Sequence, residues 1–193
     1  MKRKHLTWEE IHCLLKTIVA EGTTYRDYCM VSMAFLHGLR ASELTGLTLN
    51  DYSPLSRTIF IRRLKGGLCS EHPLLPEENT ALQRWLQQRQ YTPGQHLPWL
   101  FWSRQGGGLS RQRFYQLVRE YGKRAALPLD IHPHMLRHAC GYNLANRGND
   151  TRLIQDYLGH KNIRHTVLYT AANSQRFINA WGVARNPVLP YCA

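Results

Sequence analysis

The chain of 193 residues has no apolar run long enough to cross a membrane, and it has little cysteine. Its five cysteines are scattered and form no C-x-x-C pair, which argues against a disulfide framework or a thiolate zinc site. The basic tip MKRK is not followed by the apolar stretch of a secretory signal. We therefore expect reduced thiols, a cytoplasmic location and no segment that spans a membrane.

Acidic residues are also scarce. The chain has 25 Lys and Arg against 13 Asp and Glu, a formal net charge of +12, and residues 97–193 hold 13 of the basic residues but only four of the acidic ones. Such an excess predicts a polyanionic partner, either nucleic acid or an anionic membrane surface. Acidic clusters such as D-x-D, which hold Mg²⁺, do not occur, so we expect neither a metal nor another cofactor.

The first half of the chain alternates helix signals with one hairpin signal. Thr7 and Glu10 form a capping-box pattern, and a second helix is expected over about 24–36. A short helix is expected over "RASELTGL", and "TIFIRR" leads through Lys65-Gly66-Gly67 into "CSEHPLL" as an antiparallel hairpin. A further helix begins near Pro76 and ends before Thr92.

The second half is helical. Ser110 can cap the helix "RQRFYQLVREYGKRAAL", and Asp150 can cap another that stops at Gly159. The apolar stripe expected to be buried on that last helix is Leu153, Ile154, Tyr157 and Leu158. The predicted fold class is mainly α with a small antiparallel β-sheet (α+β), in a single domain over residues 1–193.

The stretch "HPHMLRH", residues 132–138, permits three interpretations. His134 and His138 have the spacing of two zinc ligands on a helix, but no Glu follows the first His and Arg137 would stand beside the metal. Pro133 at a first helical position indicates an ordinary helix start. His134 and Arg137 share one face, so they could also bind an anion such as a DNA phosphate.

Five more residues lie in motifs that suit the same anion site. "GLRASEL" places Arg40 at a helix start with Glu43 three residues later, and "LKGG" places Lys65 at a hairpin tip. "LGHKNIRHTVLYT" places His160 after a helix stop and Tyr169 nine residues further on.

Together these motifs resemble the signature of the tyrosine site-specific recombinases, the phage integrase family. Four segments are similar to the fimbrial phase-variation invertases of enteric bacteria: "HGLRASEL", "RLKGG", "HPHMLRHACG" and "RLIQDYLGHKNIRHTVLYT". The resemblance covers about residues 6–180. It implies a tyrosine recombinase catalytic domain that inverts a promoter-bearing DNA segment and so regulates transcription of surface structures.

The resemblance implies that Tyr169 attacks the scissile phosphate and forms a 3′-phosphotyrosyl bond without metal or ATP. Arg40 and Arg137 would bind the non-bridging oxygens, a role for which planar, permanently charged guanidinium groups are suited.

The same resemblance implies roles for the remaining signature residues, in proton transfer and in binding the phosphate. His134 would be the base for the tyrosine, with Glu43 orienting it. His160 would donate a hydrogen bond to the phosphate, and Lys65 would protonate the leaving 5′-oxygen.

The expected partner is double-stranded DNA with inverted-repeat sites, bound by a homotetramer and possible accessory DNA-bending proteins. We expect no separate N-terminal core-binding domain, and residues 174–193 are expected either to dock on a neighbouring protomer or to cover the chain's own core. DNA contact is also expected from the basic side chains of the helix over 110–125: Arg111, Arg113, Arg119, Lys123 and Arg124.

Four alternatives remain at this stage: a DNA-binding transcriptional regulator with the recombinase fold, an integrase or resolvase of a mobile element, a relaxing topoisomerase, and a zinc hydrolase. His132, His138 and His165 lie outside the signature; they are interpreted as helix-surface or phosphate-contacting groups with no assigned role.

Overall fold

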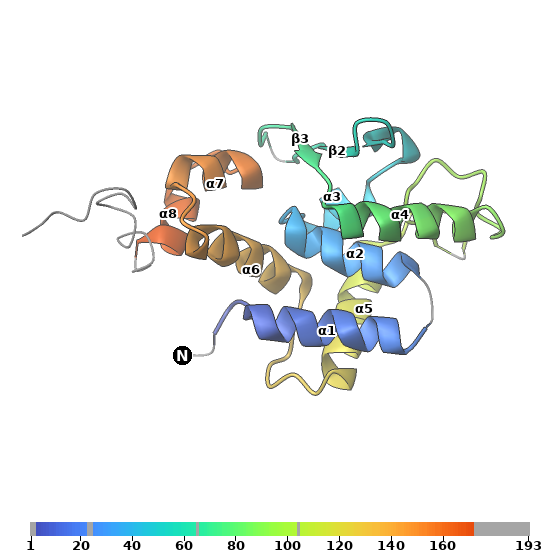
Figure 1. Cartoon of the computed structure of the whole chain (residues 1–193), viewed down its shortest axis with the longest axis horizontal. Coiled ribbons are helices and arrows are strands. Elements are labelled where there is room, and N and C mark those ends of the chain that lie inside the picture. The colour runs from blue at the N-terminus through green and yellow to red at the C-terminus, as the bar shows by residue number, and fades with distance from the viewer. Residues whose placement is uncertain (1–2, 23–24, 65, 104, 172–193) are drawn as a thin grey trace, which may run out of the picture.

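The computed structural model describes residues 3–22, 25–64, 66–103 and 105–171 (Figure 1). Lys65 and the predicted assembly segment 174–193 therefore lie outside the described residues. The elements in chain order are α1 (Trp8–Ala20), α2 (Tyr25–Leu36), α3 (Ala41–Thr45), the 3-10 helix η1 (Leu49–Asp51), β1 (Tyr52–Ser53), β2 (Thr58–Ile61), β3 (Ser70–Pro73), α4 (Pro76–Arg89), α5 (Arg111–Arg124), α6 (Pro133–Asn146), α7 (Thr151–Leu158) and α8 (Arg164–Thr170).

The predicted class, mainly helical with a small antiparallel sheet, is confirmed. The predicted caps also form. The Thr7 hydroxyl accepts from the Glu10 backbone N–H at 3.3 Å while the Glu10 carboxylate accepts from that of Thr7 at 2.8 Å. Ser110 and Asp150 cap α5 and α7 through their side chains. Among the described helices, none combines the length and the apolarity needed to span a bilayer.

The buried stripe predicted for α7 is partly wrong. Ile154 and Leu158 are buried, but Leu153 is 44% exposed. The third buried residue of this helix is Gln155, whose amide donates to the His160 carbonyl at 2.9 Å. Residues 154, 155 and 158 share one face of a 3.6-residue helix, and Leu153 lies beside that face toward solvent.

The hairpin forms with β2 antiparallel to β3, in the register Ile61 to Ser70 and Thr58 to Pro73. Alternation along β2 directs Ile59 and Ile61 into the core, where both are fully buried. A third strand, β1, pairs with the other edge of β2. It has only two residues, too few to show a period-two pattern.

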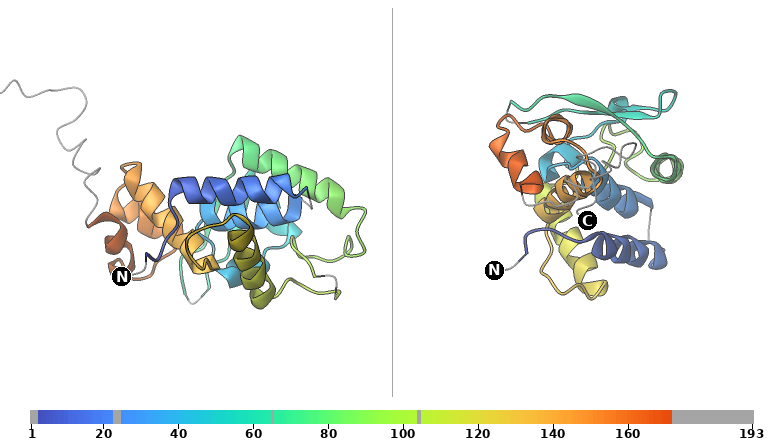
Figure 2. Two further views of the ribbon diagram at one scale, coloured as in Figure 1. Left: turned by 90° about the horizontal axis from the view of Figure 1, so that it is seen from below. Right: turned by 60° about the vertical axis from the view of Figure 1, so that its left-hand side comes forward.

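Helix α2 is the centre of the packing. It contacts α1, α4 and α6, with α1 on one side and α4 on the other (Figures 1 and 2). Eight of its twelve residues are buried, as expected for a helix surrounded by others. Helices α6, α7 and α8 pack on one another at one end of the molecule, and the hydrophobic core continues from α2 into them.

The loop over 91–99 is tied to α4 by Arg89. This buried guanidinium donates to the carbonyls of Gln95, Leu97 and Trp99. The Trp85 indole also donates to the Leu100 carbonyl at 3.1 Å. The chain before and after the loop therefore contributes to the same hydrophobic core.

Gly38 follows α2 with a left-handed φ of 58°, and a Cβ there would lie 2.3 Å from Leu158 Cδ2. Gly38→Ala should therefore add overpacking of about 1–3 kcal/mol to the left-handed penalty of about 1–2 kcal/mol. Gly22→Ala is the matched control, since Gly22 has φ 61° and nothing within 4 Å of its Cβ position. Urea unfolding should show a larger loss for Gly38→Ala; equal losses would contradict the predicted clash.

Candidate active site

The turn between α2 and α3 positions Arg40 and Glu43. Glu43 occupies the third position of α3, where its Oε2 accepts from the Arg40 backbone N–H at 3.0 Å. The Arg40 side chain then donates from Nη1 to Glu43 Oε1 at 2.5 Å. Arg40 keeps about a quarter of its side chain exposed, whereas Glu43 is buried. The Arg40 guanidinium is thus partly exposed at the surface, and the buried Glu43 carboxylate holds it in place.

Glu43 is shared by three arginines. Besides Arg40, Arg63 donates from Nη1 to Glu43 Oε2 at 2.9 Å, and Arg137 Nη1 lies 3.9 Å from the same oxygen. Burial raises the pKa of the Glu43 carboxyl, but the hydrogen bond from the Arg40 backbone and the charges of Arg63 and Arg40 outweigh it. The net pKa lies below its ordinary value, so Glu43 is ionised at neutral pH.

Arg137 lies on α6 and is buried. Its Nη1 donates to the Gly38 carbonyl and its Nη2 donates to the Leu158 carbonyl at 2.7 Å. Burial, together with the charges of Arg40 and Arg63, lowers the pKa of Arg137 to about 10, which leaves it charged at neutral pH. A guanidinium has five N–H donors, so these two bonds leave others available for an anion.

Tyr169 lies on α8 with 3% of its surface exposed. Its ring packs edge-on against Tyr142 at 5.1 Å and lies against Gly141, where a Cβ would come within 2.6 Å of it. Its hydroxyl is 3.0 Å from Nδ1 of His138. Burial raises the pKa of Tyr169 to about 12, with Arg137 acting in the opposite direction. The phenol is therefore neutral in the DNA-free protein.

His160 follows Gly159, which ends α7 at the predicted position and does so in the left-handed conformation. Its Nδ1 lies 2.9 Å from Thr166 Oγ1, and its ring lies 6.3 Å from that of Tyr169. Burial and the charges of Arg137 and Arg40 lower the pKa of His160 to about 3. The ring is neutral at pH 7, and the contact with Thr166 leaves Nε2 to face another group.

His134 is exposed on α6, with its ring 6.1 Å from that of His138. Lys65 itself lies outside the described residues, but its hairpin approaches the site. A Cβ on Gly67 would lie 2.7 Å from the Gly159 carbonyl, and the Leu64 backbone N–H lies 3.4 Å from Glu43 Oε1. The structure therefore brings five of the seven predicted catalytic residues together from α3, α6, α8 and the end of α7: Arg40, Glu43, Arg137, His160 and Tyr169. His134 adjoins them through His138, which contacts Tyr169.

Two residues of this cluster were missed by the sequence analysis. Arg63 is fully buried, and a signal for it exists: it continues the inward-facing alternation of Ile59 and Ile61 on β2. A charged residue at such a position needs a buried partner, which is Glu43. His138 was considered as a zinc ligand and as a helix-surface or phosphate-contacting group, without a role at the tyrosine. Among the residues that the structure describes, no three His, Cys, Asp or Glu side chains are grouped to hold a metal.

The basic residues predicted for DNA contact are all exposed on α5. Three of them pair at the surface: Arg113 with Glu120, Arg119 with Asp130 and Arg124 with Glu21. Within the described part of the chain, no ion pair involves the other two, Arg111 and Lys123.

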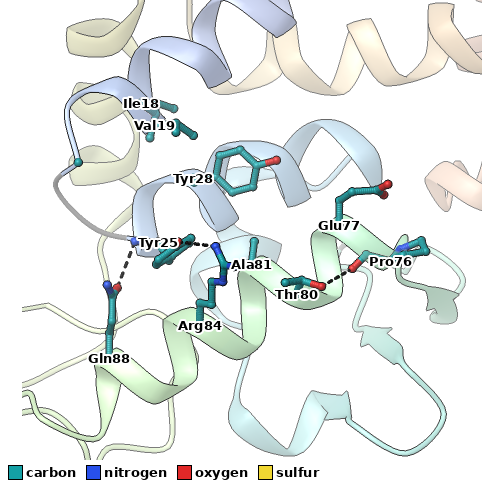
Figure 3. A pocket seen from close by; sticks show the side chains of 11 residues that line it. Ile18, Val19, Tyr25, Tyr28, Pro76, Glu77, Thr80, Ala81, Arg84 and Gln88 are labelled. Carbon is teal, nitrogen blue, oxygen red and sulfur yellow. Dashed lines mark hydrogen bonds between the residues drawn. The ribbon is translucent and has the colours of Figure 1, made fainter.

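A separate hollow of about 580 Å³ lies between α1, α2 and α4 (Figure 3). Ile18, Val19, Tyr28 and Ala81 give it apolar walls, and Arg84 crosses it to donate to the Tyr25 hydroxyl at 2.7 Å. It contains none of the predicted catalytic residues.

Comparison with known proteins decides the family. The model of the phage integrase family matches residues 4–176. The chain belongs to the phage integrase family. This integrase is 50% identical over 184 residues to the type 1 fimbriae regulatory protein FimB of Escherichia coli K12, covering 95% of this chain and 92% of FimB. It is 48% identical to FimE of the same strain, covering 93% and 91% of the two chains.

A solved structure agrees. The XerH site-specific recombinase bound to its difH substrate, in a pre-cleavage complex, superimposes with a TM-score of 0.78 at 25% identity. The match covers 95% of this chain and 55% of the XerH chain. The predicted resemblance is confirmed, and the integrase is a site-specific recombinase and a DNA strand-transferase.

Removing Arg63 should destabilise the integrase, because Glu43 would lose its fully buried cation and the carbonyls of His37 and Tyr157 would lose a donor. Breaking one side of a buried ion pair costs about 3–5 kcal/mol, which is expected for Arg63→Met in chemical unfolding. The control is Arg152, whose pair with Asp156 has both side chains exposed, at 71% and 50%, so Arg152→Met should cost under about 1 kcal/mol. Similar losses for the two variants would argue against the role assigned to Arg63.

Proposed function

We propose that this recombinase inverts a promoter-bearing DNA segment between inverted repeats and thereby switches expression of fimbriae or another surface structure. The support is its high identity to two proteins named as regulators of type 1 fimbriae, over nearly the full length of both. XerH, a recombinase of the same fold, is bound to a DNA substrate. The net charge of +12 suits double-stranded DNA as the partner.

The reaction proposed for this site is a reversible phosphoryl transfer. The Tyr169 oxygen forms a bond to the scissile phosphorus while the bond from phosphorus to the 5′-oxygen breaks. Arg40 and Arg137 bind the non-bridging oxygens, where negative charge accumulates. The observation that carries the proposal is the arrangement of one buried tyrosine beside a cluster of arginines that share a single carboxylate. The phosphotyrosyl bond keeps the energy for rejoining, so ATP is not needed.

The other signature residues transfer protons or form hydrogen bonds with the phosphate. His160, whose neutral ring contacts Thr166 through Nδ1, donates from Nε2 to a phosphate oxygen. Lys65 protonates the leaving 5′-oxygen, and His134 acts as a base on the solvent side of α6. Glu43 is proposed to orient His134. It also fixes the positions of Arg40 and Arg63, a role that its hydrogen bonds with them support.

We propose further that a homotetramer brings two sites together in the cytoplasm, with residues 174–193 docking between protomers, and that DNA-bending proteins assist. The chain would act as a single catalytic domain. A transcriptional regulator that binds DNA without cutting it remains the second candidate, because the relatives are named as regulatory proteins.

Covalent trapping tests the nucleophile. The probe is a nicked duplex built on an inverted repeat that the wild-type protein selects from randomised DNA, so that the cleaved strand cannot be rejoined. Wild type should give a denaturation-resistant adduct without added metal, and Tyr169→Phe should give none, since only the phenolic oxygen can form the bond. Tyr142→Phe, which alters the tyrosine packed against Tyr169, should still react.

The trapping result separates the candidate functions. Adducts from both wild type and Tyr169→Phe would show that another residue is the nucleophile. Binding of the selected repeat without any adduct from wild type would favour the regulator.

The salt dependence of binding tests α5. Arg111→Ala and Lys123→Ala should each lower the slope of log affinity against log salt by about one, because each removes one phosphate contact. Binding of the selected duplex would be measured by fluorescence anisotropy from about 50 to about 200 mM KCl. Lys16→Ala, on the exposed side of α1, is the control and should leave the slope unchanged. An unchanged slope in the α5 variants would remove this helix from the DNA interface.

A further inference from the structure

The side chain that touches the reacting oxygen is His138, which the family signature does not include. It lies on α6 one turn after His134, and its Nδ1 is 3.0 Å from the hydroxyl of Tyr169. The two rings meet edge-on, with centroids 5.8 Å apart and an interplanar angle of 62°. The contact is therefore directional and involves the oxygen that is to bond to phosphorus.

The proton in this contact belongs to the phenol. Burial raises the pKa of Tyr169 to about 12, so its O–H is intact and donates. Burial, His134 and Arg137 lower the pKa of His138 to about 4, so the imidazole is neutral at pH 7. A neutral imidazole that accepts at Nδ1 carries its own proton on Nε2.

The charged and titratable groups around His138 all lower its pKa. His134 and Arg137 face it from α6, and His5 and His132 face it from the segments before α1 and α6; each opposes a positive charge on the ring. A DNA phosphate seated on the nearby arginines would add the opposite charge and so favour protonation of the imidazole. Proton acceptance is thus disfavoured in the empty site and promoted by the substrate.

We propose that His138 is a catalytic residue that holds the Tyr169 hydroxyl and accepts its proton as the phenol attacks the phosphate. This inference rests on the assignment of Tyr169 as nucleophile in the proposed function. The O–H bond of Tyr169 breaks and an Nδ1–H bond forms on His138, while the phenolic electron pair makes the bond to phosphorus. The 5′-oxygen leaves with a proton from the acid, and on rejoining each proton returns.

His134 then acts after His138 in the same path. Its exposed ring lies 6.1 Å from that of His138, which is only partly buried. His138 receives the proton directly, and His134 can pass it outward. The signature histidine and the contacting histidine thus have different tasks.

The resting contact can be tested without DNA. In ¹⁵N-histidine NMR spectra at pH 7, His138 should be the Nε2–H tautomer with Nδ1 as hydrogen-bond acceptor. Tyr169→Phe should shift the Nδ1 resonance, because the variant loses the donor. An Nδ1–H tautomer, or a resonance that Tyr169→Phe does not move, would overturn the proposal.

Kinetics test the proton transfer. His138→Asn keeps an acceptor near the position of Nδ1 but cannot take a proton, and His138→Leu removes the acceptor as well. Both should slow single-turnover adduct formation on the nicked inverted-repeat probe by on the order of 100-fold. As the pH rises, the wild-type rate should level off once His138 is neutral. The rate of His138→Asn should instead keep rising with pH. His12→Asn, an exposed histidine on α1, is the matched control with an unchanged rate.

A sulfur substitution separates the base from the acid. When sulfur replaces the bridging 5′-oxygen, the leaving thiolate needs no proton, so Lys65→Ala should recover on this substrate while His138→Asn stays slow. A wild-type rate in His138→Asn, or its recovery with sulfur, would overturn the inference about His138. If wild type itself forms no adduct, the proposed function fails instead, and gel-shift binding and circular dichroism show that each variant is folded and bound.

Discussion

The buried carboxylate of Glu43 is the interaction on which the site depends. One anion is shared by Arg40, Arg63 and Arg137, so the cluster retains an excess of positive charge in a region with little solvent. The positive charges repel one another: burial is the main cause of the lowered pKa of Arg137, and repulsion from Arg40 and Arg63 lowers it further. A phosphate that enters the site supplies the missing negative charge. Substrate binding and completion of the charge balance are therefore the same event.

The same arginines connect the site to the fold through the ends of two helices. Arg63 and Arg137 donate to the carbonyls of His37 and Gly38, just beyond α2, and to those of Tyr157 and Leu158, at the end of α7. Carbonyls at a helix C-terminus lack partners within the helix, and the negative end of the dipole favours cations there. The guanidinium groups are held by backbone positions that the central helix determines, which limits their movement when DNA binds.

Local chemistry explains which features were predictable. The caps at Thr7, Ser110 and Asp150 and the left-handed Gly159 depend on neighbouring residues alone, so the sequence analysis located those helix ends correctly. The exposure of Leu153 depends on which face of α7 meets the rest of the protein. The pairing of Arg63 with Glu43 likewise joins residues on different elements, and motif spacing along the chain does not encode it.

Neutral histidines fit a site whose charge comes from arginine. Burial, and after it the positive neighbours, keep His138 and His160 unprotonated at neutral pH, with pKa values lowered to about 4 and about 3. Attraction for the phosphate then varies little around pH 7, because guanidinium groups keep their charge there. The neutral imidazoles can then act at one nitrogen each: His138 accepts at Nδ1 and His160 donates from Nε2. Guanidinium groups thus bind the phosphate while neutral imidazoles move protons, and burial, with the nearby positive charges second, keeps the imidazoles neutral.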